Sequence, residues 1–251
     1  MSNDIKLGIG LASGMFFHAP AGTELPTYPT ECVGGNGDGT TTDKFTATAS
    51  QSTFTLTEDA TGLVKMTVNG TAVSEDDYTL EDGDVVYSGT ALLADDKVAI
   101  TYYISAWRLV GDVAKDGITL NTDKTVDNIY TWANVAKRTV LSEHTETVQV
   151  PVIDTTEDTL KVVLGEDNVS VTAASGSHGK TIACNLSAAT LPDPEAYLFV
   201  MKDGDDSMAV GISNGQITAV ESITFAPDSA ITWNPTITVL DNSAKFISEE
   251  G

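Results

Sequence analysis

Apolar and polar residues alternate with a period of two along much of the chain. Residues 64–68, 97–102 and 147–152 show the pattern most clearly, and they are rich in Thr, Val and Ile. Alternation of this kind places every second side chain on the same face of a strand. Each stretch therefore predicts a β-strand with one face on a core and the other toward solvent or a partner. Asn69-Gly70 follows the first stretch and predicts a tight hairpin turn, because both residues tolerate positive φ.

Residues 154–165 follow a helical pattern instead, with their apolar side chains on one helical face. Thr155 is placed to cap the amide of Asp158, and the acidic residues of the first turn suit the positive end of the helix dipole. Gly165 stands where a left-handed residue commonly ends a helix. The segment predicts a single short α-helix in a chain that is otherwise mainly β.

A change of composition divides the chain. The glycine-rich residues 34–39 read as a flexible linker, and several short strand patterns separated by polar turns follow them. We expect residues 36–105 to form an inserted β-rich module of small β-sandwich size. The discontinuous remainder, 1–35 and 106–251, is then expected to form one core domain.

The charge of the chain excludes several classes of partner. Its 251 residues carry 13 Lys+Arg against 36 Asp+Glu, a formal net charge of −23, and 41% of them are hydrophobic. That apolar content is enough for a folded chain. A protein that grips nucleic acid needs Lys and Arg on the phosphates, and docking on an anionic membrane needs them as well. The charge still permits work beside nucleic acid without binding it.

The two cysteines, Cys32 and Cys184, lie far apart and form neither a zinc pair nor a disulfide framework, so we expect two separate reduced thiols. Residues 1–18 lack the basic start of a signal peptide. No apolar run approaches the ~20 residues that span a bilayer.

Residues 176–181 read GSHGKT, which is similar to a phosphate-binding loop. Such a loop needs a glycine at the position that Ala174 occupies here, since the backbone amides otherwise form no cradle. We expect a Gly/Ser-rich turn. The chain also lacks the Gly-x-Ser-x-Gly pattern of a serine hydrolase.

Metal chemistry has little support. His18, His144 and His178 have no His or Cys at a ligand spacing, although His144 stands between two glutamates. The acidic clusters at 81–84 and 203–206 lack the spacing of a calcium loop and predict solvated turns. We expect no catalytic residue, no metal and no cofactor.

Residues 107–118, WRLVGDVAKDGI, resemble the signature of major tail tube proteins from long-tailed (siphovirus-type) bacteriophages: an aromatic residue, Leu, Gly, Val and then Asp-Gly. Further segments resemble that family in the same order, at 19–26, 129–132, 137–140, 146–165 and, as its last strand, 233–240. The residues that carry the resemblance are Gly22, Leu25, Pro26, Trp107, Leu109, Gly111, Val113, Asp116, Gly117, Trp132, Gly165 and Trp233. Residues 36–105 resemble a small β domain of phage tail and fibre proteins through Phe45, Phe54, Val68, Asn69, Gly70 and Tyr78.

The resemblance implies a tail-tube β-sandwich or barrel with one flanking short helix, and the inserted module on the tube exterior. It implies a structural virion protein whose copies, six to a ring, stack into the tail tube. The tube holds the tape measure protein and conducts genome DNA without binding it specifically. The protein would contact further copies of itself, the tail terminator and the distal tail proteins. It would not contact a membrane. Assembly would take place in the host bacterial cytoplasm.

The resemblance to this family also implies a function for the negative net charge of the chain. Six copies would carry roughly −138 per ring. Acidic side chains on the lumen would repel phosphates within a Debye length of ~8 Å, so that DNA slides through.

Two other functions remain open. In one of them the module is part of an adhesin and binds host carbohydrate by stacking sugars on its aromatic side chains, which are Phe45, Phe54, Tyr78, Tyr87, Tyr102 and Tyr103. Aromatic residues at strand positions are more often core. A β-rich hydrolase is the third reading, and it needs a site that the sequence does not show.

Overall fold

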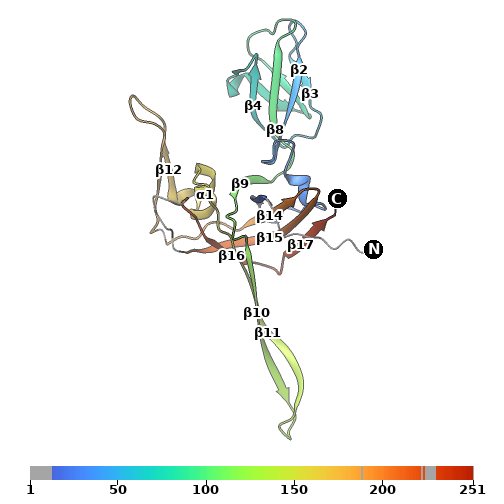
Figure 1. Cartoon of the computed structure of the whole chain (residues 1–251), viewed down its shortest axis with the longest axis vertical. Coiled ribbons are helices and arrows are strands. Elements are labelled where there is room, and N and C mark those ends of the chain that lie inside the picture. The colour runs from blue at the N-terminus through green and yellow to red at the C-terminus, as the bar shows by residue number, and fades with distance from the viewer. Residues whose placement is uncertain (1–12, 188, 222, 224–229, 251) are drawn as a thin grey trace. The chain divides into compact units, whose positions relative to one another are not determined.

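The structure, a computed structural model, describes residues 13–187, 189–221, 223 and 230–250. They are mainly β-strand with a single α-helix among them, which confirms the predicted fold class. The chain divides into two compact units (Figure 1). The first unit comprises Met1–Leu25 and Val110–Gly251, and the second comprises Pro26–Leu109. The boundaries expected from composition, 36 and 105, fall inside the second unit, and its place on a tube exterior stays a prediction.

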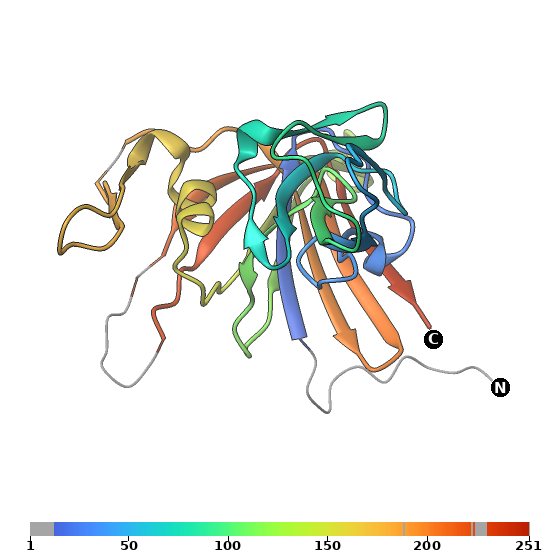
Figure 2. The ribbon, with the colours of Figure 1, turned by 90° about the horizontal axis from the view of Figure 1, so that it is seen from above.

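One large sheet organises the first unit. Its strand order is β10-β11-β16-β15-β14-β1-β9, and β17 pairs with β15 beside this path. Figure 2 shows β1 in blue beside the orange strands β14 and β15. The strands are β1 (Ser13–Pro20), β9 (Arg108–Asp112), β10 (Thr119–Tyr130), β11 (Ala136–Gln149), β14 (Glu195–Asp203), β15 (Asp206–Val220), β16 (Pro235–Val239) and β17 (Ala244–Glu249).

The sheet curls back on itself through the chain that continues β9 and β11. Val152 bridges both Val113 and Trp233 in antiparallel pairs. The amide of Ile153 donates to the carbonyl of Asp112 at 3.1 Å, which extends the same junction. These bonds join the two sides of the sheet, so that one face of it becomes the inside of a barrel-like fold.

Apolar side chains from alternate strand positions fill this interior. Phe16 stacks on Phe199 with ring centroids 4.8 Å apart, and the ring centroid of Tyr197 lies 5.8 Å from that of Phe16. Burial of such large side chains is the main favourable term for a fold of this size. The fully enclosed cluster consists of Phe16, Val110, Val148, Val150, Val152, Val162, Tyr197, Phe199, Ile212, Ile217 and Ile237.

The predicted helix is confirmed as α1 (Glu157–Leu164), but its cap is one residue later than expected. Thr156 is the N-cap, and its hydroxyl accepts from the amide of Thr159 at 3.1 Å. The prediction of Thr155 as cap is wrong, because its hydroxyl instead accepts from Trp233 Nε1 at 3.1 Å. Gly165 has a φ of +90°, as its position predicted, while its ψ of 141° lies outside the left-handed helical region.

Two further details of the first unit differ from or extend the sequence analysis. The strand expected to be last, within 233–240, is β16, and β17 follows it. The Gly/Ser-rich turn expected at 176–181 connects β12 (Val169–Thr172) to β13 (Thr181–Cys184) in a separate hairpin. The unit also contains the short 3-10 turn η3 (Glu166–Asn168).

The second unit has its own hydrophobic core. Its strands are β2 (Thr40–Thr46), β3 (Thr53–Thr55), β4 (Gly62–Val68), β5 (Thr71–Ala72), β6 (Tyr78–Glu81), β7 (Asp84–Tyr87) and β8 (Lys97–Tyr103), with 3-10 turns η1 (Pro29–Cys32) and η2 (Glu75–Asp77). They form a four-stranded sheet, β2-β8-β4-β5, and a three-stranded sheet, β3-β7-β6. Phe54, Met66, Val85, Ile100 and Tyr102 are buried at the centre.

The period-two stretches of the sequence correspond to strands in both units. Residues 64–68 lie in β4 and residues 97–102 in β8. Residues 147–149 end β11, and the buried Val148, Val150 and Val152 continue the alternation beyond it. Alternation is therefore a reliable guide here, because each of these strands buries one face.

Candidate assembly surfaces

A long hairpin, formed by β10 and β11, extends away from the rest of the first unit (Figure 1). Every residue of β10 is exposed, as is most of β11 before Thr145. Two strands without further partners are only marginally stable in water. The free edge of β10 also carries unpaired backbone groups, which in other proteins pair with a further chain. The exposed side chains and the free edge of the hairpin therefore indicate that it binds another protein chain.

One face of the hairpin is apolar at intervals. Leu120, Val126, Tyr130 and Leu141 alternate onto the face that also bears the buried Val148, and all four are exposed. A bulge between Thr125 and Val126 keeps this pattern in register across the two strands. This side of the hairpin continues the face that lines the barrel interior.

The other face is polar and continuous with part of the outer face of the sheet. From the sheet as far as Asp127 this side carries four carboxylates and neither Lys nor Arg, and we call this part the polar face. By the register of β10, β11, β15 and β16 its polar residues are Thr119, Asn121, Asp123, Thr125, Asp127, Glu143, Thr145, Thr147, Gln149, Gln216, Thr218, Glu221, Thr236 and Thr238. Val140 and Ala219 are its apolar positions, and beyond Asp127 the same side of the hairpin bears Ile129 and Arg138.

Hydrogen bonds tie the polar face together across strands. The hydroxyls of Thr218 and Thr238 lie 2.9 Å apart, and Gln149 Nε2 donates to Glu221 Oε1 at 2.5 Å. Threonine suits such a surface, because its branched carbon packs on the pleat while its hydroxyl stays available to water. The sequence analysis missed this face, although the alternation of Thr, Asn and Asp from 119 to 127 is a visible signal for it.

His144 helps to fix the base of the hairpin. Its Nδ1 lies 2.9 Å from Asn242 Oδ1 in the turn between β16 and β17, and its Nε2 lies 3.2 Å from Glu146 Oε1. These contacts give His144 a structural position, half-buried on β11. Among the described residues no three His, Cys, Asp or Glu side chains gather as a metal site would require.

The N-terminal residues that resemble the tail tube signature lie around the end of β1. Gly22 has a φ of +82° in the turn, and its amide donates to the carbonyl of Ser213 at 2.8 Å. Leu25 then covers the sheet at Gly211, where an added Cβ would come within 2.7 Å of the Leu25 side chain. Gly211 is thus required for this close approach. Pro26 is half-buried at the start of the second unit.

The central residues of the resemblance shape β9 and the turn after it. An added Cβ at Gly111 would meet Asp154 Oδ2 at 2.7 Å, and that oxygen accepts from the amide of Asp112 at 2.6 Å. Burial and the neighbouring Asp154 raise the pKa of Asp112. Gly117 has a φ of +70° and closes a turn, in which its amide donates to the carbonyl of Ala114 at 2.9 Å.

The remaining residues of this set fall in different surroundings. Leu109 is half-buried on β9, Val113 bridges Val152, and Asp116 is exposed in the turn before β10. Trp107 and Trp233 are 3% and 4% exposed. Trp132, in contrast, is fully exposed at the end of the hairpin.

In the second unit the residues of the resemblance serve the fold. Phe54 and Tyr78 are buried, and Phe45 and Val68 pack against the same core. Asn69 and Gly70 have positive φ in the turn between β4 and β5, and Asn69 Oδ1 accepts from the amide of Lys97 at 2.8 Å. Tyr102 is also fully buried. Phe54, Tyr78 and Tyr102 are therefore occupied by the core, whereas Phe45, Tyr87 and Tyr103 are partly exposed.

The cysteines and the acidic clusters considered in the sequence analysis occupy structural positions. Cys32 is buried and Cys184 is partly buried, and neither is in a disulfide. The acidic clusters at 81–84 and 203–206 lie at the turns between β6 and β7 and between β14 and β15. Within the described residues no helix is long and apolar enough to cross a bilayer.

Glu157, at the start of α1, makes two ion pairs, and the one with Lys180 ties the turn at 176–181 to the helix. Its carboxylate lies 2.7 Å from Lys161 Nζ and 2.6 Å from Lys180 Nζ, and hydrogen bonds from these two lysines lower the pKa of Glu157 to about 2. A lowered carboxyl pKa stabilises the fold above its unfolded value near 4.5, and the effect is lost as pH falls through about 2.

We therefore expect the turn at 176–181 to stay attached to α1 at pH 3 and to be released near pH 2. The NMR resonances of the Lys180 side chain, followed between pH 4 and pH 1.5, measure the release. In Glu157→Gln these resonances should stay at the released position throughout this range. Identical Lys180 resonances of the parent and the variant at pH 3 would refute the tether.

A family model described as phage tail tube protein matches residues 85–250. The match begins within β7 and runs through β17, so it includes the hairpin, the polar face and α1. The resembling segment at 19–26 lies outside it. No curated protein matches the chain in a sequence search.

Proposed function

The chain belongs to the phage tail tube protein family, and on this basis we propose that its copies close into rings that stack into the tube of a phage tail. Membership of the family makes it a structural component of the virion tail. The proposal goes further in three respects. The rings contain six copies, they assemble in the bacterial cytoplasm, and the finished tube holds the tape measure protein and then conducts DNA during ejection.

The polar face is the observation that carries this proposal. A channel for DNA needs a wetted wall that does not hold phosphates, and binding to phosphates depends on Lys and Arg. The polar face offers Thr, Asn, Gln and four carboxylates, with no cation among its residues. We assign it to the lumen. The helix α1 packs through Val162 on the opposite, apolar face of the sheet, which directs the helix away from the channel.

Ring closure and stacking require two different contacts. A head-to-tail contact whose rotation closes gives a ring, and a second contact that never closes gives a filament. The exposed hairpin, with its apolar face and free edge, supplies surface for such contacts in every copy.

Negative-stain microscopy tests the proposed function directly. The purified chain, concentrated or seeded with tail tips, is expected to form hollow tubes with regular axial banding. Antibody labelling of virions that carry the chain should decorate the tail along its length. A chain that stays monomeric under all these conditions, together with virions labelled away from the tail shaft, would overturn the proposal.

A further inference from the structure

The end of the hairpin, residues 130–138, presents an aromatic knob that we call the tip. Trp132 is fully exposed there, and Tyr130 and Val135 are more than half exposed. The turn is held in one shape, because the amide of Thr131 donates to the carbonyl of Val135 at 2.9 Å and Asn134 adopts a φ of +58°. An exposed apolar group on an ordered turn is characteristic of an interaction site.

The tip is also basic. It contains Lys137 and Arg138 and no acidic residue, in a chain whose formal net charge is −23. The tip contributes +2 to that total, so the rest of a copy carries a net charge of −25, and a second copy is an electrostatically favourable partner for the tip.

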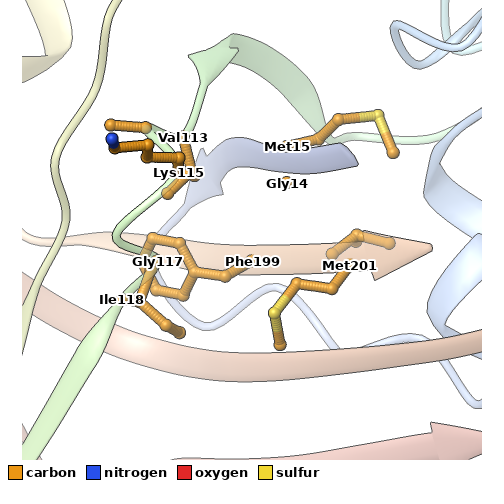
Figure 3. A pocket seen from close by; sticks show the side chains of 10 residues that line it. Gly14, Met15, Val113, Lys115, Gly117, Ile118, Phe199 and Met201 are labelled. Carbon is orange, nitrogen blue, oxygen red and sulfur yellow. The ribbon is translucent and has the colours of Figure 1, made fainter. Parts of the chain in front are cut away.

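The root of the same hairpin has an apolar cavity of about 140 Å³ (Figure 3). It lies between the start of β1, the end of β14 and the turn that leads into β10. We call it the methionine pocket. Its main lining side chains are Met15, Val113, Ile118, Phe199 and Met201, with Lys115 at the rim.

The pocket and the tip are complementary in size and chemistry. A cavity of about 150 Å³ lined by apolar side chains binds benzene. One ring of an indole is of that size, and methionine sulfur makes favourable contacts with aromatic rings. Four acidic residues, Asp116, Asp203, Asp205 and Asp206, are close in sequence to the lining residues, against two basic ones, Lys115 and Lys202. The surroundings of the pocket therefore keep a net charge of −2, which favours the approach of Lys137 and Arg138.

The positions of the two features decide which copies can meet. The twelve residues of β10 separate root from tip by roughly 36 Å at ~3.3 Å per residue. Figure 1 shows that the tip points away from the rest of its own unit. A tip can therefore enter only the pocket of another copy, displaced by about one hairpin length. Repetition of that displacement produces a filament and never closes.

We propose that Trp132 of one copy inserts into the methionine pocket of a copy in the adjacent ring, so that the hairpin sets the axial repeat of the tube. This inference rests on the proposed function, because it requires stacked rings. It assigns the stacking contact to named side chains, and it makes the tip and the pocket the two halves of one joint.

Fluorescence of the unmodified chain provides the first test. Trp107 and Trp233 are almost fully buried, so acrylamide should quench only Trp132 in the unassembled protein. Tube formation is expected to remove this quenchable component and to shift the emission to shorter wavelength. Tubes visible by microscopy in which Trp132 remains quenchable would overturn the inference and leave the proposed function standing. If the chain forms no tubes and virions are labelled away from the tail shaft, the proposed function itself fails.

Cross-linking tests the pocket. A Cys184→Ala chain is used as background, since burial raises the pKa of the remaining Cys32 to about 12 and leaves it unreactive. Chains with Ala133→Cys, next to the tip tryptophan, are mixed with chains carrying Lys115→Cys and treated with a short bis-maleimide. A cross-linked dimer is expected in tubes only.

Three further variants complete this experiment. Thr172→Cys on β12, also exposed, should give no cross-link to Ala133→Cys in the same tubes. Trp132→Ala should abolish tubes, whereas Leu93→Ala, which removes another exposed apolar side chain, should leave them intact. Tubes of normal length from Trp132→Ala, or cross-linking to position 172 in place of 115, would each refute the joint.

Discussion

Replacement of Phe16 by alanine is expected to lower the free energy of unfolding of the first unit by about 3–5 kcal/mol. Phe16 is fully buried inside the barrel-like fold and contacts the rings of both Phe199 and Tyr197. Its removal leaves a cavity and loses two aromatic contacts at once. A domain is stable by only about 5–15 kcal/mol, so this one change removes a large share of that stability.

Hydrogen exchange followed by mass spectrometry measures the effect, because it resolves the two units separately. Protection should fall in β1, β14 and β15 and remain unchanged in β4 and β8. Tyr197→Phe is the matched variant: it keeps the ring and removes a buried hydroxyl that has no hydrogen-bond partner among the described residues, so its cost should stay below about 1 kcal/mol. A loss of less than about 1 kcal/mol in Phe16→Ala would contradict the packing described here.

The sequence predicts which residues of a strand are buried in the core that Phe16→Ala probes, but not which strands pair with one another. Alternation at 147–152 predicts which of those residues are buried, because the period of a strand is fixed by its backbone. The partner strands were not predictable, since Val148 meets Ile237 and Phe16 meets Phe199 across long stretches of chain. Such pairings depend on how the whole sheet packs, which local pattern does not encode.

The helix shows the same limit on a smaller scale. Its existence and its end at Gly165 followed from local sequence, whereas the choice of Thr156 over Thr155 as cap did not. Both threonines are able to cap. A contact from elsewhere decides between them, because Trp233 Nε1 donates to the hydroxyl of Thr155.

The assembly surfaces were only half visible in the sequence. Trp132 was identified through its resemblance to a family segment, and the structure places it on a fully exposed turn. The polar face was missed because it combines four strands from 119–127, 143–149, 216–221 and 236–238. Its acidic residues are spread thinly along a chain with 36 Asp and Glu, so they become recognisable only when the register brings them onto one surface.

Reversal of charge on the polar face is expected to slow the passage of DNA strongly. The combined change Asp123→Lys, Asp127→Lys and Glu143→Lys turns the net charge of the polar face from −4 to +2 in each copy. A ring of six copies would then present about twelve net positive charges to the phosphates, and each cation that pairs with a phosphate adds to the affinity for DNA. DNA would then bind to the lumen wall formed by the polar face, instead of sliding past it. The rate of ejection from virions with this tube, triggered in vitro and followed by dye binding to released DNA, is expected to fall by at least tenfold at low salt.

The salt dependence separates this mechanism from a general defect of assembly. Added salt shortens the Debye length and returns counterions to DNA, so raising ionic strength should restore ejection toward the parental rate. Asp59→Lys, Glu75→Lys and Asp76→Lys in the second unit change the net charge of the chain by the same amount at exposed positions outside the polar face. They should leave ejection unchanged. If both triple variants slow ejection equally, the total charge matters and the assignment of the polar face to the lumen fails; if neither does, the wall does not act on DNA through its charge.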